Sequence, residues 1–301
     1  MKTIEAYEKD IKMQTKFLQH FKRHAPISHA QQKNAIFTGS GDSLASAMLA
    51  EAFSDFRVKA MDPLDLLKSQ KIVKDKTVYF VSISGNTISN IKVAKKAKKA
   101  IAITSQEKSR LANSCSKTIL LKSPNSDVFT AGSISFLDSA LTCISIVSKF
   151  AIENFDYYKL ALSSAKRSKF GKRIFILGNM YTYPIAMYGA AKFYELLGHD
   201  AHFERIEQFS HMELFSAKKG DTVIIFEEPN PHNLQLVKHL KKVGLEVIHP
   251  KINSKNKISQ IIFYTFFSQI LPLLKAKRKN QKDCHFVLAK NFRKVSDVMI
   301  Y

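Results

Sequence analysis

The sequence predicts an α/β protein built from two lobes, each a doubly wound parallel sheet. Its 301 residues exceed one typical domain and fit two domains of about 150 residues each. Short, wholly apolar strand segments alternate with helical segments, which is typical of parallel sheets that helices cover on both faces. The pattern around Ile36 also returns around Ile174, so the chain contains the same unit twice.

Each half begins with a strand, a tight loop and a helix. In the first half the strand is Ala35–Thr38, the loop covers residues 39–43 and an amphipathic helix covers 44–53. The second half repeats this order, with a strand over 173–177, a loop over 178–181 and a helix over 183–197.

A second strand, loop and helix follow in each half. In the first half, strand Thr77–Val81 precedes a polar loop and a lysine-rich helix that we expect to reach Ala100, before a strand over 101–103. The lysines of this helix are expected to form a solvated face: Lys92, Lys95, Lys96, Lys98 and Lys99. The second half follows with a strand over 222–226, a loop over 227–231, a helix over 232–243, the helix stop Gly244 and a strand over 246–248.

These units predict four segments: a leading helix over 1–24, a first lobe over 25–165, a second lobe over 166–286 and a C-terminal tail over 287–301. The N-terminus alternates charged and apolar residues and lacks the uninterrupted apolar run of a signal peptide. The apolar run 258–274 is interrupted by polar residues and falls short of the ~20 apolar residues of a membrane span. We therefore expect a buried helix there and no membrane association.

The net charge of +22 favours anionic partners without choosing among them. Much of the excess is lysine in helical patterns, so a nucleic-acid partner is not expected. Three cysteines, Cys115, Cys143 and Cys284, are far apart and form no paired motif, which indicates a reducing cytoplasm rather than a disulfide framework or a zinc site. Three histidines also show no ligand spacing with carboxylates, so we expect neither metal nor cofactor: His199, His202 and His249.

Ligands of open parallel sheets bind at the carboxyl ends of the strands, where the strand order reverses. The loop Ser82–Thr87 lies there, between a strand and a helix, and offers hydroxyls, a glycine and backbone N–H groups to a phosphate. The alternative is that its polar residues only cap the helix. The candidate substrate-binding residues are Gly39, Ser40, Gly41, Ser82, Ser84, Gly85, Asn86, Thr87 and Ser133.

The equivalent loop of the second half carries Glu227 and Glu228, which would repel a phosphate. One phosphate site per chain is therefore expected. The first loop, around Gly39 and Gly41, gives backbone freedom for close ligand approach but is not a G-x-G-x-x-G motif, so no dinucleotide is predicted.

At these loops and over residues 192–211 the chain resembles the double-SIS (sugar isomerase) family. It is most similar to the isomerase half of glucosamine-6-phosphate synthase and to archaeal sugar-phosphate isomerases, over about residues 36–290. The loop Ser82–Thr87 matches the family pattern Ser-x-Ser-Gly-x-Thr, and Gly189–Glu195 matches Gly-Ala-x-Lys-x-x-Glu. The resemblance implies two flavodoxin-like SIS lobes and a sugar phosphate held by the first of these loops.

The resemblance also implies catalytic roles for four residues. Glu195 is the expected base that moves a proton between C1 and C2 of an open-chain hexose 6-phosphate, and Lys192 adds positive charge one turn away. His211 suits sugar ring opening, and Lys290, in Leu-Ala-Lys, suits a Schiff base or enediolate stabilisation. Family members take the histidine from a second subunit, which implies a homodimer with a shared active site.

The chain departs from the synthase pattern in two ways. It begins Met1-Lys2, without an N-terminal cysteine or a glutaminase-sized extension, and the family's Glu-x-x-His reads Gln208-Phe209-Ser210-His211. The sequence thus predicts a phosphosugar isomerase without a glutaminase domain. An amino-sugar phosphate deaminase or aminating enzyme, and a non-catalytic sugar-phosphate sensor, remain the alternatives.

Overall fold

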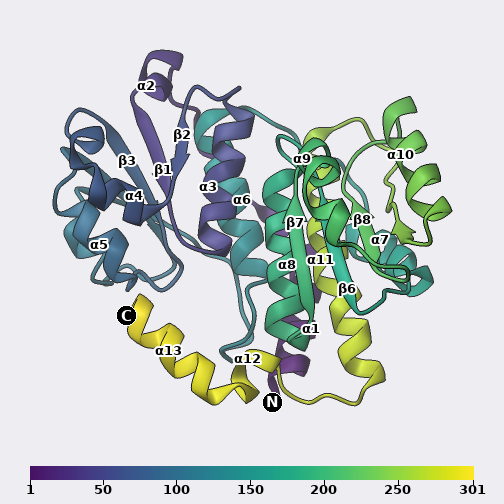
Figure 1. Cartoon of the computed structure of the whole chain (residues 1–301). Helices are drawn as coiled ribbons and strands as arrows, with labels where there is room; N and C mark the ends of the chain where they lie inside the picture. The colour runs from purple at the N-terminus through teal and green to yellow at the C-terminus, as the bar shows by residue number, and fades with distance from the viewer. The chain divides into compact units, whose positions relative to one another are not determined.

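The computed structural model describes all 301 residues and contains two parallel sheets, one in each of two compact lobes (Figure 1). The first sheet has the strand order β2-β1-β3-β4-β5 and the second has the order β7-β6-β8-β9. Every strand pair is parallel, so the expected class of two doubly wound α/β lobes is confirmed.

The first lobe comprises Lys16–Asn125, Gly132–Ala151 and Ala289–Tyr301. Its strands are β1 (Ala35–Thr38), β2 (Lys59–Met61), β3 (Thr77–Val81), β4 (Lys99–Thr104) and β5 (Lys117–Leu120). Its helices are α2 (His29–Lys33), α3 (Asp42–Phe53), α4 (Pro63–Lys68), α5 (Ile88–Ala94), α6 (Ile134–Val147) and α13 (Lys290–Ile300), with short 3-10 turns η1 (Gln70–Val73) and η2 (Ala112–Ser114).

The second lobe comprises Met1–Thr15, Ser126–Ala131 and Ile152–Leu288, so helix α1 (Thr3–His20) contributes its first turns here. Its strands are β6 (Arg173–Leu177), β7 (Asp200–Glu204), β8 (Thr222–Ile225) and β9 (Glu246–Ile248). Its other helices are α7 (Tyr157–Arg167), α8 (Tyr183–Leu197), α9 (Ile206–His211), α10 (Pro231–Lys242), α11 (Lys257–Arg278) and α12 (His285–Leu288), and it contains the 3-10 turn η3 (Glu213–Ser216).

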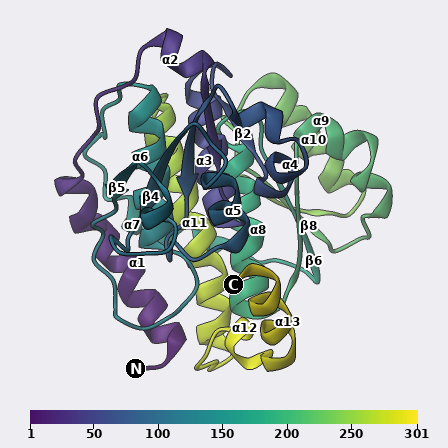
Figure 2. The ribbon, with the colours of Figure 1, turned by 90° about the vertical axis from the view of Figure 1, so that its left-hand side faces the viewer.

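Alternate side chains of the first sheet fill two apolar layers. Phe37 and Tyr79 stack at 4.5 Å between ring centroids in a layer that α3 and α6 cover. Ile36, Val78 and Phe80 point to the opposite face, where α4 and α5 cover them. Figure 2, in which this lobe faces the viewer, shows the helices on the two sides of the sheet. Covering helices on both faces explain why the strands are uniformly apolar.

The second sheet is covered in the same way. Phe175 and Val223 face α9 and α10, whereas α8 and α11 lie on the other face. At Gly189 the contact with α11 is so close that a Cβ would lie 2.9 Å from Ser268 Oγ and 3.2 Å from Ile176 Cδ1. Close helix packing thus accounts for the glycine of the Gly-Ala-x-Lys-x-x-Glu segment.

Helix α11 contains the apolar run that the sequence predicts to be a buried helix. It is long and apolar enough to cross a membrane, but 89% of its most apolar 18 residues are buried inside the structure. Ile261, Phe266 and Phe267 are completely buried. The helix therefore has the environment of a core helix.

The lysine-rich helix is shorter than expected, and that prediction is wrong. Helix α5 ends at Ala94, so among the five lysines only Lys92 is helical. The reason is the register of β4, in which Lys99 pairs with Thr77 of β3, so the chain must leave the helix early to enter the sheet. The C-terminal segment also differs from a simple tail, because it forms α12 and α13.

Candidate functional site

Two loops of the first lobe meet at the carboxyl edge of its sheet. The strand order reverses between β1 and β3, and ligands of open α/β sheets bind at such a point. The two strands pair in parallel with Thr38 opposite Phe80, so the loops that follow them are neighbours. These loops are residues 39–41 and 82–87, which contain eight of the nine candidate binding residues.

The loop Ser82–Thr87 is folded around its own hydroxyl groups. The buried Ser82 Oγ accepts a hydrogen bond from the Gly85 N–H at 3.2 Å and lies 3.3 Å from Thr87 Oγ1. Ser84 Oγ accepts from the Asn86 N–H at 3.4 Å. Ser84, Asn86 and Thr87 are half-buried, so their polar atoms reach the surface of a loop whose backbone is internally bonded.

The loop leads directly into α5, and its side chains do not cap that helix. Thr87 occupies the N-cap position, but its side chain makes no capping hydrogen bond. The N–H groups of Ile88 and Ser89 in the first turn have no protein acceptor. Thr87 therefore does not act as a helix cap, contrary to the alternative reading of this loop. The N–H groups of Ile88 and Ser89 are available to an anion.

Gly85 is required by the shape of this loop. Its φ is +64°, in the left-handed region that favours glycine. A Cβ there would lie 2.1 Å from Ser109 Oγ, and the Gly85 carbonyl accepts from the Leu111 N–H at 2.9 Å. The segment around Ser109 thus packs on the loop from outside and fixes its conformation.

Ser133 reaches the same edge from α6. The hydroxyls of Ser46 and Ser139 lie 2.8 Å apart, so α3 and α6 pack side by side, and both helices follow strands of one parallel sheet. Ser133 is the N-cap residue of α6 and is 2% exposed, yet its Oγ has no hydrogen-bond partner. A buried hydroxyl without a partner costs about 1–3 kcal/mol, which a ligand oxygen or a water would recover.

The equivalent edge of the second lobe is filled by a side chain of the protein. Glu227 follows β8, and its Oε1 accepts from the Asn179 N–H at 2.9 Å and from Thr182 Oγ1 at 2.7 Å. Burial raises the pKa of Glu227. Its carboxylate therefore occupies the N-terminal end of α8, where an external anion would otherwise bind.

Lys192 and Glu195 form an ion pair on α8. Lys192 Nζ lies 2.5 Å from Glu195 Oε2 and 4.6 Å from the ring centroid of Tyr188. The lysine side chain is completely buried, whereas that of Glu195 is 32% exposed. The carboxylate is thus held by a fixed cation on one side and accessible on the other.

The other two candidate catalytic residues are at the surface. His211 ends α9 with its side chain 70% exposed, and its Nε2 lies 3.1 Å from Glu207 Oε1. Lys290 is exposed at the first position of α13. No contact joins His211 to Glu195 within the second lobe, so the structure does not bring these two residues together.

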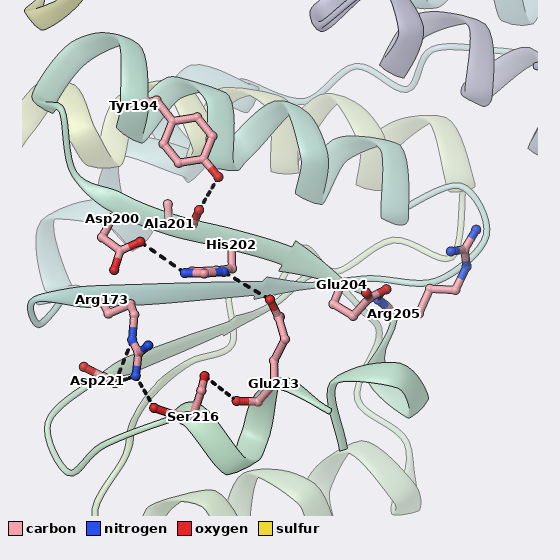
Figure 3. Close-up of polar contacts among 10 residues, drawn as sticks. All are labelled: Arg173, Tyr194, Asp200, Ala201, His202, Glu204, Arg205, Glu213, Ser216 and Asp221. Carbon is pink, nitrogen blue, oxygen red and sulfur yellow. Dashed lines mark hydrogen bonds and ion pairs between the residues drawn. The ribbon is translucent and has the colours of Figure 1, made fainter. Parts of the chain in front are cut away.

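One histidine has carboxylate neighbours that the sequence did not indicate. His202 Nδ1 lies 3.1 Å from Glu213 Oε1, and its Nε2 lies 3.1 Å from Asp200 Oδ1, as Figure 3 shows. Sequence spacing alone does not reveal these two contacts, because Glu213 lies eleven residues away on another element. The two carboxylates approach opposite sides of the ring and cannot converge on one ion, and no cluster of His, Cys, Asp or Glu in the structure forms a metal site.

A hollow of about 510 Å³ lies along β9 and is lined by none of these residues. Basic side chains line it, including Arg167, Lys169 and Lys251, together with Glu246 and His249. None of the candidate binding or catalytic residues lines this hollow. The first-lobe loops, which contain eight of the nine candidate binding residues, are therefore the better candidate site.

Comparison with known proteins places part of this chain in a family. Residues 171–252, from just before β6 to just after β9, match the family model of the SIS domain. The second lobe carries a SIS domain. A search of curated proteins finds no significant match. The first lobe has the same strand order as this SIS domain with one further strand, β5, at its edge.

Solved structures extend the likeness from the SIS domain to both lobes. Glucosamine-6-phosphate deaminase from Thermotoga maritima superposes with a TM-score of 0.69 at 19% identity, over 93% of this chain and 95% of that one. Tagatose-6-phosphate ketose/aldose isomerase from Escherichia coli gives 0.66 at 16% identity, over 92% and 90%. The C-terminal domain of glucosamine-fructose-6-phosphate aminotransferase from Francisella tularensis gives 0.65 at 16% identity, over 90% and 92%. At these identities the likeness concerns the fold.

Proposed function

We propose that the protein is a phosphosugar isomerase that interconverts the aldose and ketose forms of a hexose or hexosamine 6-phosphate. The observation that carries the proposal is the loop Ser82–Thr87, which presents hydroxyls and free N–H donors at the point where the strand order of the first sheet reverses. The SIS domain in the second lobe and the fold of the sugar-phosphate enzymes it resembles support the same class of substrate.

In this proposal the first lobe holds the phosphate. The half-buried Ser84, Asn86 and Thr87 and the first-turn N–H groups of α5 suit the oxygens of a dianion. The buried Ser133 hydroxyl, which has no partner in the protein, is a further donor for the same ligand. Gly39, Ser40 and Gly41 line the neighbouring loop, where the absence of large side chains allows close approach.

The proposed chemistry is proton transfer between C1 and C2 of the open-chain sugar. The carboxylate of Glu195 removes the proton from C2 of the aldose, giving an enediolate. The oxygen at C1 then gains a proton, the hydroxyl at C2 loses one to become the ketone, and protonated Glu195 returns its proton to C1. Lys192 orients this carboxylate and supplies fixed positive charge beside it. His211 is the proposed ring-opening residue and Lys290 the proposed partner of the carbonyl or enediolate. The reaction as written needs no metal and no cofactor.

We further propose that the working form is a cytoplasmic homodimer. His211 and Lys290 are both exposed in the single chain, whereas a proton-transfer site works best with its groups held out of bulk water. A second copy that covers these residues would remove that discrepancy.

The test is proton exchange in ²H₂O, followed by NMR on fructose 6-phosphate and glucosamine 6-phosphate. The proposal expects deuterium at C1 or C2 with the wild-type protein and none above background with Glu195→Gln, which keeps the shape and an acceptor for Lys192. Glu246→Gln, at an exposed position on β9, is the matched control and should leave exchange unchanged. Normal exchange by Glu195→Gln would remove this residue from the mechanism.

Two alternatives predict different results in the same assay. An amino-sugar phosphate deaminase, the activity named for the Thermotoga maritima structure, would release ammonia from glucosamine 6-phosphate. A sugar-phosphate sensor would bind the ligand and catalyse no exchange, since one fold serves many functions.

A further inference from the structure

The C-terminal helix α13 has a sharply divided surface and buries nothing. Its apolar stripe repeats at the spacing of two helical turns, and its members are between 57% and 81% exposed: Leu288 just before the helix, then Phe292, Val295 and Met299. Its opposite side carries three basic residues and Asp297, which lies 3.8 Å from Arg293. An isolated helix of 11 residues is only marginally stable in water, so this helix needs a surface that covers its stripe.

Only Ala289 separates α13 from α12, the last helix of the second lobe. Helix α12 is fixed to α8, because His285 packs directly over Gly198 at the end of that helix. We call α13, with its exposed apolar stripe, the arm. Arms that carry an unpaired apolar face are typical of contacts exchanged between identical subunits.

A complementary surface lies at α9 and η3 of the second lobe. We call it the α9–η3 patch: Met212 and Phe215, which are 55% and 85% exposed, together with the partly exposed carboxylates of Asp200, Glu207 and Glu213. Residues 200–213 contain four carboxylates and one arginine, in a chain whose net charge is +22. The patch thus combines exposed apolar side chains with carboxylates, whereas α13 is apolar on one side and basic on the other.

The patch is held in place from two sides. His202 of β7 contacts Glu213 at the start of η3, and Arg173 of β6 donates to the Ser216 carbonyl at its end (Figure 3). Arg173 is itself anchored by Asp221 at 3.1 Å. Phe215 therefore projects from a turn that is tied to the sheet at both ends, and a rigidly presented aromatic side chain is the usual centre of a protein interface.

We propose that α13 of one chain docks on the α9–η3 patch of a second copy, with Phe292 and Val295 against Phe215 and Met212. Two such contacts related by a twofold axis close a dimer, because each chain offers one arm and one patch. The inference rests on the homodimer of the proposed function and names its contact surfaces. The opposite charges of the arm and the patch would speed association.

The test is the mass of the full chain in solution, measured by sedimentation velocity over a concentration series. The wild type is expected to form a dimer. Phe215→Glu and Phe292→Glu should each raise its dissociation constant by about 30-fold or more, the effect of losing an interface hot spot. Leu234→Glu, at a 50% exposed position on α10, is the matched control and should leave the dimer intact.

Mixing the two variants tests the reciprocal contact. A Phe215→Glu chain keeps its arm and a Phe292→Glu chain keeps its patch, so the mixture should form heterodimers through one intact contact, more tightly than either variant alone. A monomeric wild type, including one that binds anionic vesicles through α13, would overturn the proposal. So would dimers that both variants leave unchanged, or a mixture no tighter than its components. Circular dichroism checks that each variant is folded.

The isomerase proposal is judged separately from this contact. If the dimer behaves as described but no deuterium enters the sugar, the reaction is wrong and the contact stands. If exchange occurs in a chain that stays monomeric, the contact is wrong and the reaction stands.

Discussion

Replacing Gly85 with alanine should destabilise the first lobe through two separable effects. The backbone φ of +64° costs a residue with a Cβ about 1–2 kcal/mol. The new Cβ would also lie 2.1 Å from Ser109 Oγ and 2.4 Å from Ser109 Cβ, and overpacking of this kind costs about 1–3 kcal/mol. Ser109 cannot move freely, because it is 7% exposed and its Oγ accepts from the Ala112 N–H. Together these effects predict a loss of about 2–5 kcal/mol.

Thermal unfolding followed by circular dichroism measures this loss. At about 2–4 °C per kcal/mol for a unit of this size, the melting temperature should fall by about 4–20 °C. Gly41→Ala separates the two effects, because Gly41 has a φ of +57° and no atom lies within 4 Å of the position that a Cβ would take, so only the backbone cost of about 1–2 kcal/mol applies. In a Ser109→Gly background, Gly85→Ala should likewise cost only about 1–2 kcal/mol. If Gly85→Ala costs no more than Gly41→Ala, the reasoning about steric contact with Ser109 is refuted.

Three further outcomes are expected. Glu195→Gln should abolish exchange of deuterium into the sugar phosphate while calorimetry still detects binding; loss of binding with exchange retained per bound molecule would contradict the assigned role. Ser133→Ala removes a buried hydroxyl without a partner, so the free energy of unfolding should stay equal or rise by about 1 kcal/mol. Sugar-phosphate binding measured by calorimetry should weaken by about tenfold. A less stable variant with unchanged affinity would show that the hydroxyl has a structural role instead. Burial raises the pKa of Asp138 above its unfolded value, so its contribution to stability is complete at low pH and is lost as pH rises through the folded pKa. Asp138→Asn should therefore gain stability relative to the wild type as the pH rises above about 4 in urea titrations, and a gap that narrows with pH would be inconsistent with this sign.

Interior strands were predictable because their residues are apolar without interruption. The bounds of β1, β3 and β6 follow from such runs, and helix α8 follows from apolar periodicity between a loop and Gly198. Three partly solvated strands at the sheet edges have no such apolar run: β2, β5 and β7. The fourth edge strand, β9, could be predicted because Gly244 ends the preceding helix just before it.

In the candidate site, too, some features could be predicted from local sequence and others could not. The loop Ser82–Thr87 could be found from its residue types and its place after a strand, since both are local properties. The burial of Lys192, the unpartnered hydroxyl of Ser133 and the carboxylate neighbours of His202 depend on elements far apart in the sequence. The end of α5 at Ala94 depends on how β4 pairs with β3, which a lysine-rich helical pattern does not reveal.

The carboxylate of Glu227 limits the number of sugar-phosphate sites in each chain. The Glu227 carboxylate already accepts hydrogen bonds from the Asn179 N–H and the Thr182 hydroxyl. In the second lobe, an anionic side chain of the protein thus occupies the position that corresponds to the proposed phosphate-binding loop of the first lobe. Duplication of the fold therefore does not double the binding capacity. A saturating titration should end at one equivalent of sugar phosphate per polypeptide, and two equivalents per dimer.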